Sequence, residues 1–414
     1  MGDLTRPTAG TAQGWVPLVV AVTLVQAVLA LMSRALPIFG MPLTLAGGVP
    51  PEAVGQLSSA TSLGSMLFFL WGPALLAGMA PLRQLQLGCV LAGGAMLLVA
   101  AGRWEALLLC ALLIGLGYGP SAPAGSDLLM QVVPQHRRAT IFSIKQAGVP
   151  LGGLAAGLLL PLVAVQGGSV AAGLATASAL AFVAAVALGR FRGLHADPPS
   201  SRMAPPWRSL LVAPVRLFAL VLGSPALAGM TAAGFALGIA QGILMGYYPV
   251  ILSDHAGWSI VGAGLAFAVL QGVGVPGRVL MGRISDRMGA PVRALSVLCL
   301  ASGATMITLA TIGTGSGRVW VIALSALAGL TVVSWNGVFL SGLAEAAPEG
   351  RVGEITAAGT FVLFSGYVMA PLAIQVVFAA RDGYGAGLVL AGIIPIVAGL
   401  ALLAGPARRP APRP

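Results

Sequence analysis

Long apolar runs, separated by short clusters of charge, glycine and proline, dominate this chain of 414 residues. Each run is close to the roughly 20 residues that an α-helix needs to cross the hydrocarbon core of a bilayer. The pattern therefore predicts transmembrane helices over 15–36, 57–79, 85–102, 106–130, 141–164, 170–190, 223–250, 260–281, 292–313, 318–343, 354–379 and 385–405. The first run is too long for the apolar core of a signal peptide, and no A-x-A site follows it, so we expect a retained helix.

A Pro- and Arg-rich stretch divides these twelve runs into two sets of six. An internal repeat supports the division, because the sequence PQHR from Pro134 recurs as PEGR from Pro348, each before the fifth helix of its half. We predict three parts: an N-terminal six-helix bundle over 1–190, a cytoplasmic link with a lateral helix over 191–222, and a C-terminal six-helix bundle with a short basic tail over 223–414.

The composition agrees with a membrane protein. Apolar residues make up 57% of the chain, charged residues only 8%, and the mean hydropathy is +0.95. A soluble protein of this length needs far more charge to cover its surface. The formal net charge of +11 could indicate nucleic acid, but the basic residues lie in short loops between apolar runs. We therefore expect a lipid bilayer as the surroundings and no nucleic-acid partner.

The arginines of the loops are unevenly distributed. If the N-terminus is cytoplasmic, the loops on the opposite side hold only Arg103, Arg318 and Arg381. Cytoplasmic loops carry an excess of Lys and Arg. This asymmetry predicts a multi-pass protein of the inner, cytoplasmic membrane of the cell, with both termini in the cytoplasm.

A charged segment, GRVLMGRISDRMGAPVR over 277–293, stands between the eighth and ninth runs. We interpret it as a glycine-punctuated loop, in which one acid among four arginines suggests a paired network. Within it, GRISDRMG over 282–289 resembles the G-x-x-x-D-R-x-G signature of the major facilitator superfamily. With the twelve runs, the link and the repeat, the resemblance covers nearly the whole chain. It implies that superfamily's fold: an all-α integral membrane protein with twelve transmembrane helices in two pseudo-symmetric six-helix bundles.

The resemblance also implies a gate. In the family, the acid of this loop pairs with basic residues and holds the cytoplasmic side shut in the outward-open state. The gating residues predicted here are Gly282, Arg283, Asp286, Arg287, Gly289, Asp127 and Arg278.

Two departures from the family pattern affect this interpretation. The first-half copy of the signature, GMAPLRQLQLG over 78–88, keeps Arg83 but has no acid, so the latch should be asymmetric. In the fourth helix Cys110 stands where many proton-coupled members have an arginine, which argues against their proton relay.

A finer likeness is carried by IFSIKQAGVPLGGLAAG over 141–157, which is similar to stretches in carriers of the cyanate and nitroimidazole type.

Ionisable side chains within a span are candidates for function, because inserting them costs several kcal/mol. Arg34 lies about five turns into the first run. It could anchor an anionic substrate, or extend to the outer interface as long basic side chains do. Asp127 and Lys145 lie near the inner ends of successive helices, where an antiparallel hairpin would allow an ion pair. That pair could be a static support, or could open when an anion reaches Lys145.

Other polar side chains deep in the spans, Trp335 and Tyr367 among them, could line a cavity or bridge helices. The strongest candidates for lining a cavity are Gln241, Tyr247 and Tyr248, which precede Pro249 on the seventh run. The predicted substrate-binding set is Arg34, Gln26, Tyr118, Lys145, Gln146, Gln241, Tyr247, Tyr248, Gln271 and Asn336. No carboxylate lies in the middle of any predicted span, so an anionic substrate is favoured over a cationic one.

These observations favour a secondary active or facilitative transporter that moves a small organic anion by alternating access. Two alternatives use the same fold: a sensor that binds solute without translocating it, and an exporter of the drug/proton antiporter type. An enzyme would need a cluster of reactive groups, whereas the three histidines are scattered and each cysteine stands alone. We expect no catalytic residue, no metal, no cofactor, and a monomer.

Overall fold

The computed structural model describes residues 15–76, 78–134, 137–194, 207–348, 351–380 and 383–404. Among these residues, 12 helical segments are long and apolar enough to cross a membrane. The all-α, twelve-helix architecture predicted from the apolar runs is therefore confirmed.

The first six segments form one bundle. Their elements are α1 (Trp15–Ile38), α2 (Gly40–Ala46), η1 (Pro51–Ala53), α3 (Val54–Leu75), α4 (Pro81–Ala95), η2 (Met96–Ala101), α5 (Trp104–Tyr118), η3 (Gly119–Ser121), α6 (Pro123–Val132), α7 (Arg138–Gln166) and α8 (Val170–Leu188), followed by η5 (Gly189–Leu194).

The last six segments form the second bundle. Their elements are α10 (Pro225–Val250), the π-helical η6 (Ile251–His255), α11 (Ile260–Met288), α12 (Pro291–Leu309), α13 (Arg318–Thr331), α14 (Asn336–Ala346), α15 (Val352–Phe378) and α16 (Gly383–Ala404).

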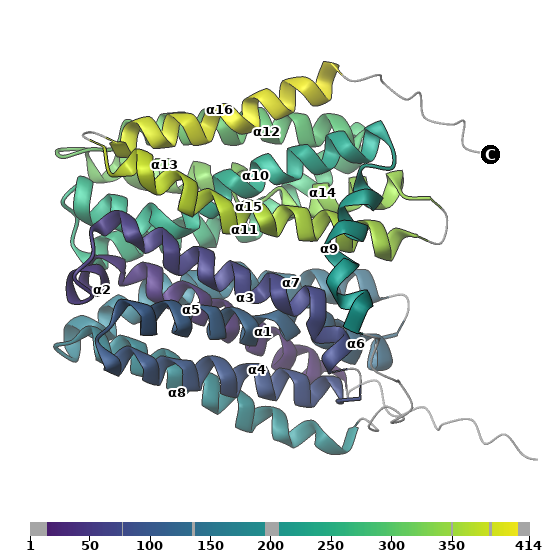
Figure 1. Cartoon of the computed structure of the whole chain (residues 1–414), viewed down its shortest axis with the longest axis horizontal. Helices are drawn as coiled ribbons and strands as arrows, with labels where there is room; N and C mark the ends of the chain where they lie inside the picture. The colour runs from purple at the N-terminus through teal and green to yellow at the C-terminus, as the bar shows by residue number, and fades with distance from the viewer. Residues whose placement is uncertain are drawn as a thin grey trace, which may run out of the picture.

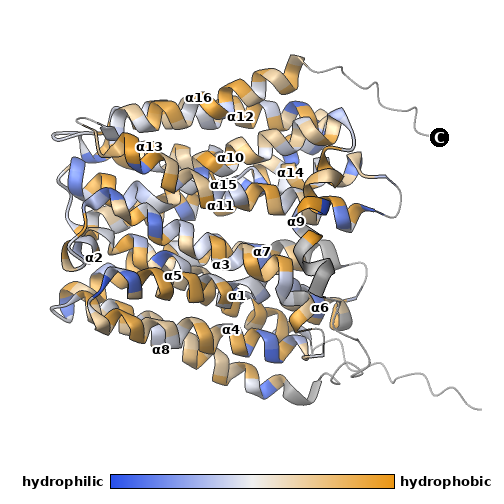
Figure 2. Ribbon diagram, in the orientation of Figure 1, coloured by the Kyte–Doolittle hydropathy of each residue, from blue (hydrophilic) through white to orange (hydrophobic). Residues whose placement is uncertain are grey.

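The two bundles lie one above the other in Figure 1, with their helices roughly parallel to a common direction. The helix α9 (Trp207–Val221) crosses between the bundles at one end, which we call the linker end; the opposite end, where α2 lies, is the far end. Hydrophobic residues cover the lengths of the helices, and hydrophilic residues gather toward the two ends (Figure 2). This distribution is what a protein surrounded by lipid along its length requires.

The helix α9 is the lateral helix expected in the link. Its apolar face packs on α15, where the rings of Phe218 and Phe361 meet edge to face at 5.5 Å. Its polar face places Arg216 3.6 Å from Glu354. The preceding part of the predicted link, 195–206, lies outside the described residues.

Glycines let the bundles approach each other closely. α7 meets α11 where Gly157 faces Gly264, and a Cβ on either would collide with the carbonyl oxygen of the other. Gly55 of α3 likewise leaves room for the phenol of Tyr247 on α10. In a membrane, helices associate through such close backbone packing rather than through apolar burial.

Directed hydrogen bonds add to this packing at the far end. Tyr247 Oη donates to the carbonyl oxygen of Glu52 at 2.8 Å, across the boundary between the bundles. Gln56 Nε2 donates to Gln375 Oε1 at 3.1 Å across the same boundary, and its Oε1 accepts from Trp104 Nε1 at 2.8 Å. The far end is therefore closed by specific polar contacts.

The segment interpreted as a loop, 277–293, is mostly helical. α11 continues to Met288, well beyond the predicted end of its run, because nothing in RISDRM interrupts a helix. The chain turns only at Gly289, whose φ is 56° and whose N–H bonds the Ser285 and Asp286 carbonyls. Of the two glycines predicted in the gate, only Gly289 thus forms the turn, and Gly282 lies within the helix.

Candidate functional site

Arg34 lies on α1, about one turn before that helix ends at Ile38. At Gly152 of α7, a Cβ would collide with the carbonyl oxygen of Ala27, so this glycine lets α7 pack directly against α1. The Arg34 side chain points into the bundle interior rather than to the outer interface. It makes no hydrogen bond or ion pair with any residue that the structure describes.

Arg278 lies on α11 of the other bundle, ten residues before that helix ends at Met288. Its Nε donates to the carbonyl oxygen of Val333 at 3.4 Å. This carbonyl lies at the break between α13 and α14, where the tenth span leaves its helical path. A Cβ at Gly277 would collide with the Ser334 side chain, so this glycine lets α11 approach the break. A discontinuous span thus supplies the backbone partner of a buried cation.

The two arginines converge with two tyrosines, Tyr118 at the end of α5 and Tyr367 in the middle of α15. All four groups lie within electrostatic range of one another, so that each guanidinium acts on the other and on both phenols. One arginine and one tyrosine come from each bundle. We call these four residues the arginine–tyrosine cluster.

The cluster contains cations without a counter-charge. Among the described residues, no carboxylate acts on Arg34 or Arg278. Each of the four side chains is half-buried. Guanidinium groups bind carboxylate and phosphate through paired hydrogen bonds, and phenols can donate a further one. The arrangement therefore has the chemistry of an anion-binding site.

Two predicted residues border the cluster. Asn336 Nδ2 lies 3.4 Å from Gln241 Oε1 and 3.5 Å from the carbonyl oxygen of Val333, which also accepts from Arg278. The break in the tenth span therefore links this amide pair to the arginine.

The remaining predicted amides bridge or fill helix interfaces. Gln26 on α1 donates through Nε2 to Gln146 Oε1 on α7 at 2.9 Å, and its own Oε1 is buried without a partner. Gln271 is buried on α11 and places Nε2 3.4 Å from Met245 Sδ. The structure does not bring these three amides into the cluster.

The tyrosines of the seventh span are also bound within the protein. Tyr247 Oη lies 2.8 Å from the carbonyl oxygens of both Glu52 and Pro371, and its single proton can be donated to only one at a time. Tyr248 Oη lies 2.7 Å from Ser325 Oγ. Both rings are fully buried. Tyr247 therefore helps to close the far end, and Tyr248 contributes to packing within the second bundle.

The predicted ion pair between Asp127 and Lys145 is not formed. Lys145 is buried, and its Nζ donates to the Ala122 carbonyl oxygen at 2.8 Å and to Ser126 Oγ at 3.0 Å. Asp127 is exposed and acts on the ammonium only through its field. The turn between α5 and α6 offers a nearer carbonyl, and this neutral partner replaces the carboxylate.

The charged side chains of the signature segment face outward. Arg283, Asp286 and Arg287 are exposed on the last turns of α11. Within the described residues Asp286 takes part in no ion pair, and the acids that do are Glu105 and Glu354. The gating role of the segment stays a prediction.

Sequence reasoning assigned Arg278 to the gate and Tyr367 only to the wider polar group. The structure instead places both beside Arg34. One signal was available for Arg278: the apolar residues VLM follow it before the next charge, so it lies one turn inside the span. No comparable signal identified the partners, because they come from four separate spans.

The described residues hold no candidate metal centre. No three His, Cys, Asp or Glu side chains gather among them. Cys89, Cys110 and Cys299 are each buried and unpaired.

Comparison with known proteins adds a family match. A model described as the Major Facilitator Superfamily matches residues 23–371. Two proteins named as uncharacterized MFS-type transporters, from the CDC 1551 and H37Rv strains of Mycobacterium tuberculosis, are each 29% identical over 306 residues. These alignments cover 73% of this chain, and the chain spans only 65% of the length of each relative.

Solved structures show the same fold at low sequence identity. The peptide transporter POT in complex with sulfate has a TM-score of 0.78 and 16% identity, with 94% of each chain covered. The nucleoside transporter NupG has a TM-score of 0.74 and 14% identity, with 94% of this chain and 99% of that chain covered. A bacterial homologue of the lysosomal transporter Spinster has a TM-score of 0.72 and 16% identity, with 95% and 96% covered.

Proposed function

Because the chain belongs to the major facilitator superfamily, we propose that it transports a small organic anion across a membrane by alternating access. The observation that carries the proposal is the arginine–tyrosine cluster. Two cations from opposite bundles meet there without a carboxylate among the described residues. A substrate held between them would contact both bundles at once, as the mechanism requires.

The sign of the substrate's charge follows from the cost of two cations on which no described carboxylate acts. An uncompensated charge in a membrane interior is expensive, and polar groups there mark substrate or ion paths. An anion would neutralise the two guanidinium groups and accept their hydrogen bonds. A cation would add a third positive charge, so the cluster disfavours cationic cargo, including the cationic drugs that an antiporter-type exporter would carry.

The direction of access is part of the proposal. Tyr247, Gln56 and their partners hold the far end closed, so the cluster would be reached from the linker end in this state. The linker end carries the basic signature helix, and the arginine excess of the loops assigns it to the cytoplasm. We therefore propose an inward-facing state of a multi-pass protein in the cytoplasmic membrane, with both termini inside.

A substrate screen followed by transport tests this proposal. Purified protein would be scanned by thermal shift against organic mono- and dianions and against matched cations. Hits would then be measured by solute counterflow in proteoliposomes. The test variants are Arg34→Gln and Arg278→Gln, and Arg318→Gln is the control because that arginine is exposed and lies away from the cluster.

We expect an anion to raise the melting temperature of the wild type and to show counterflow. A charged hydrogen bond contributes about 1.5–3 kcal/mol, so each cluster variant should bind roughly 10- to 100-fold more weakly. The control should match the wild type. Stabilisation by cations alone would overturn the anion assignment, and anion binding without counterflow would identify a sensor instead.

A further inference from the structure

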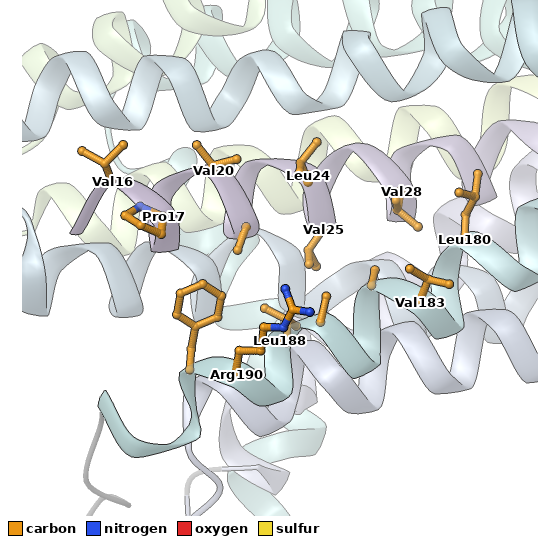
Figure 3. A pocket seen from close by; sticks show the side chains of 14 residues that line it. Val16, Pro17, Val20, Leu24, Val25, Val28, Leu180, Val183, Leu188 and Arg190 are labelled. Atoms are coloured by element: carbon orange, nitrogen blue, oxygen red, sulfur yellow. The ribbon is translucent and has the colours of Figure 1, made fainter. Parts of the chain in front are cut away.

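An apolar groove lies on the outer surface of the first bundle, between α1 and α8 (Figure 3). Its volume is about 620 Å³, within the range of pockets that hold small ligands. Its walls include exposed apolar side chains, of which Leu24 keeps 59% and Val183 64% of its surface accessible. No acidic residue lines the groove, and its one charged residue is Arg190.

The groove has a direction. In Figure 3 the two helices are close where Val28 faces Leu180, and they separate toward Val16 and Arg190. The wide end is therefore the linker end, because Arg190 lies in η5, just before the link. An elongated apolar group could enter from that end and lie along the two helices.

Positive charge gathers at the wide end. Arg190 is exposed, extends toward α1, and has no hydrogen bond or ion pair among the described residues. At the start of α1, the guanidinium carbon of Arg137 lies 5.9 Å from the centre of the Trp15 ring. Trp15 directly precedes Val16, a lining residue of the groove. Tryptophan and arginine together are typical of the depth at which lipid head groups lie.

We propose that this groove is a binding site for one anionic phospholipid. An acyl chain lies along the apolar walls, and the phosphate is held by Arg190 with Arg137 beside it. The apolar walls of the groove suit an acyl chain, and the unpaired Arg190 at the wide end suits a negatively charged head group. A zwitterionic lipid gains less, because its own cation opposes both arginines.

The site is independent of transport. Arg34 does not line the groove and lies six residues beyond Val28, the lining residue of α1 nearest to it, so occupancy can be measured without a known substrate.

Native mass spectrometry of the full chain in detergent tests the proposal. The probes are phosphatidylglycerol and phosphatidylcholine with identical acyl chains. Arg190→Gln removes the head-group contact, and Ala184→Phe fills the groove. Their matched controls are Arg293→Gln, an exposed arginine of the second bundle, and Val186→Phe, an exposed residue of α8 that does not line the groove.

We expect the wild type to retain one phosphatidylglycerol at least fivefold more strongly than phosphatidylcholine. Arg190→Gln should lose this preference, and Ala184→Phe should lose the bound lipid of either kind, whereas both controls keep them. Equal binding of the two lipids by the wild type would overturn the proposal, as would an unchanged preference in Arg190→Gln. Undiminished binding in Ala184→Phe would overturn the placement of the tail, and a dimer in place of bound lipid would identify a second copy as the occupant.

Discussion

The two ends of the molecule are held together by different kinds of contact. At the far end, Tyr247 and Gln56 make buried or half-buried hydrogen bonds from one bundle to the other. Toward the linker end, the bundles meet through the edge-to-face rings of Phe69 and Phe364, 5.0 Å apart, which lie next to Tyr367 of the cluster, and then through α9. The ion pair there between Arg216 of α9 and Glu354 of α15, at 3.6 Å, is exposed.

This difference indicates which end can change at low cost. A buried hydrogen bond specifies one geometry, and breaking it leaves a desolvated group. An exposed ion pair contributes about 0–1 kcal/mol and exchanges readily for water. The contacts of the far end are therefore costly to break in this state, whereas the linker end holds contacts that can be released and remade.

The largest effect should come from forcing the far end apart. A Cβ at Gly55 would collide with the Tyr247 phenol and the Pro371 carbonyl oxygen, so Gly55→Leu should act as a wedge. We expect transport to fall by ~10-fold or more, since a shift of ~1.4 kcal/mol between states suffices. A cysteine introduced as Ser58→Cys, at the same level, should react faster with an impermeant maleimide.

Gly94→Leu is the control for the wedge, because nothing lies within 4 Å of a Cβ at that position. The native cysteines are buried and should add little background. If Gly55→Leu leaves the labelling of Ser58→Cys unchanged, the far end is not the closed gate.

An intermediate effect is expected at the linker end. Asp286 is unpaired in this far-end-closed structure, so a latch that uses it would form only in the opposite state. Asp286→Asn should slow counterflow by ~3- to 10-fold, which corresponds to about 1 kcal/mol, and leave substrate binding unchanged. Glu345→Gln, which removes another exposed acid of this end, should have no effect. A parallel loss of binding and expression would show that Asp286 only supports folding.

The smallest effect should come from removing one far-end hydroxyl. Tyr247→Phe loses a hydrogen bond worth about 1 kcal/mol, so the labelling rate of Ser58→Cys should rise a few-fold. Tyr248→Phe is the matched control, because its partner Ser325 belongs to the same bundle. Equal labelling of the two variants would mean that the bond from Tyr247 to Glu52 does not hold the bundles together.

The spans were predictable from the sequence because an apolar run is a local property. The extension of α11 to Met288 was not, since a charged helix end outside the membrane core has no hydrophobic signal. Lys145 donates to the carbonyl oxygen of Ala122 and forms no ion pair with Asp127. This outcome depends on the path of the turn between α5 and α6, which the sequence does not specify. The sequence also does not show that Arg278 lies near Arg34, because that proximity depends on how the two bundles are placed relative to each other.

The unpaired arginines have a consequence for the empty carrier. To change sides without cargo, the bundles would have to close both ends around two dehydrated cations, and dehydration costs several kcal/mol per ion. A bound anion removes most of that barrier by acting as the missing counter-charge. We therefore expect the loaded protein to reorient faster than the empty one, so that one-for-one exchange of anions outpaces net uptake.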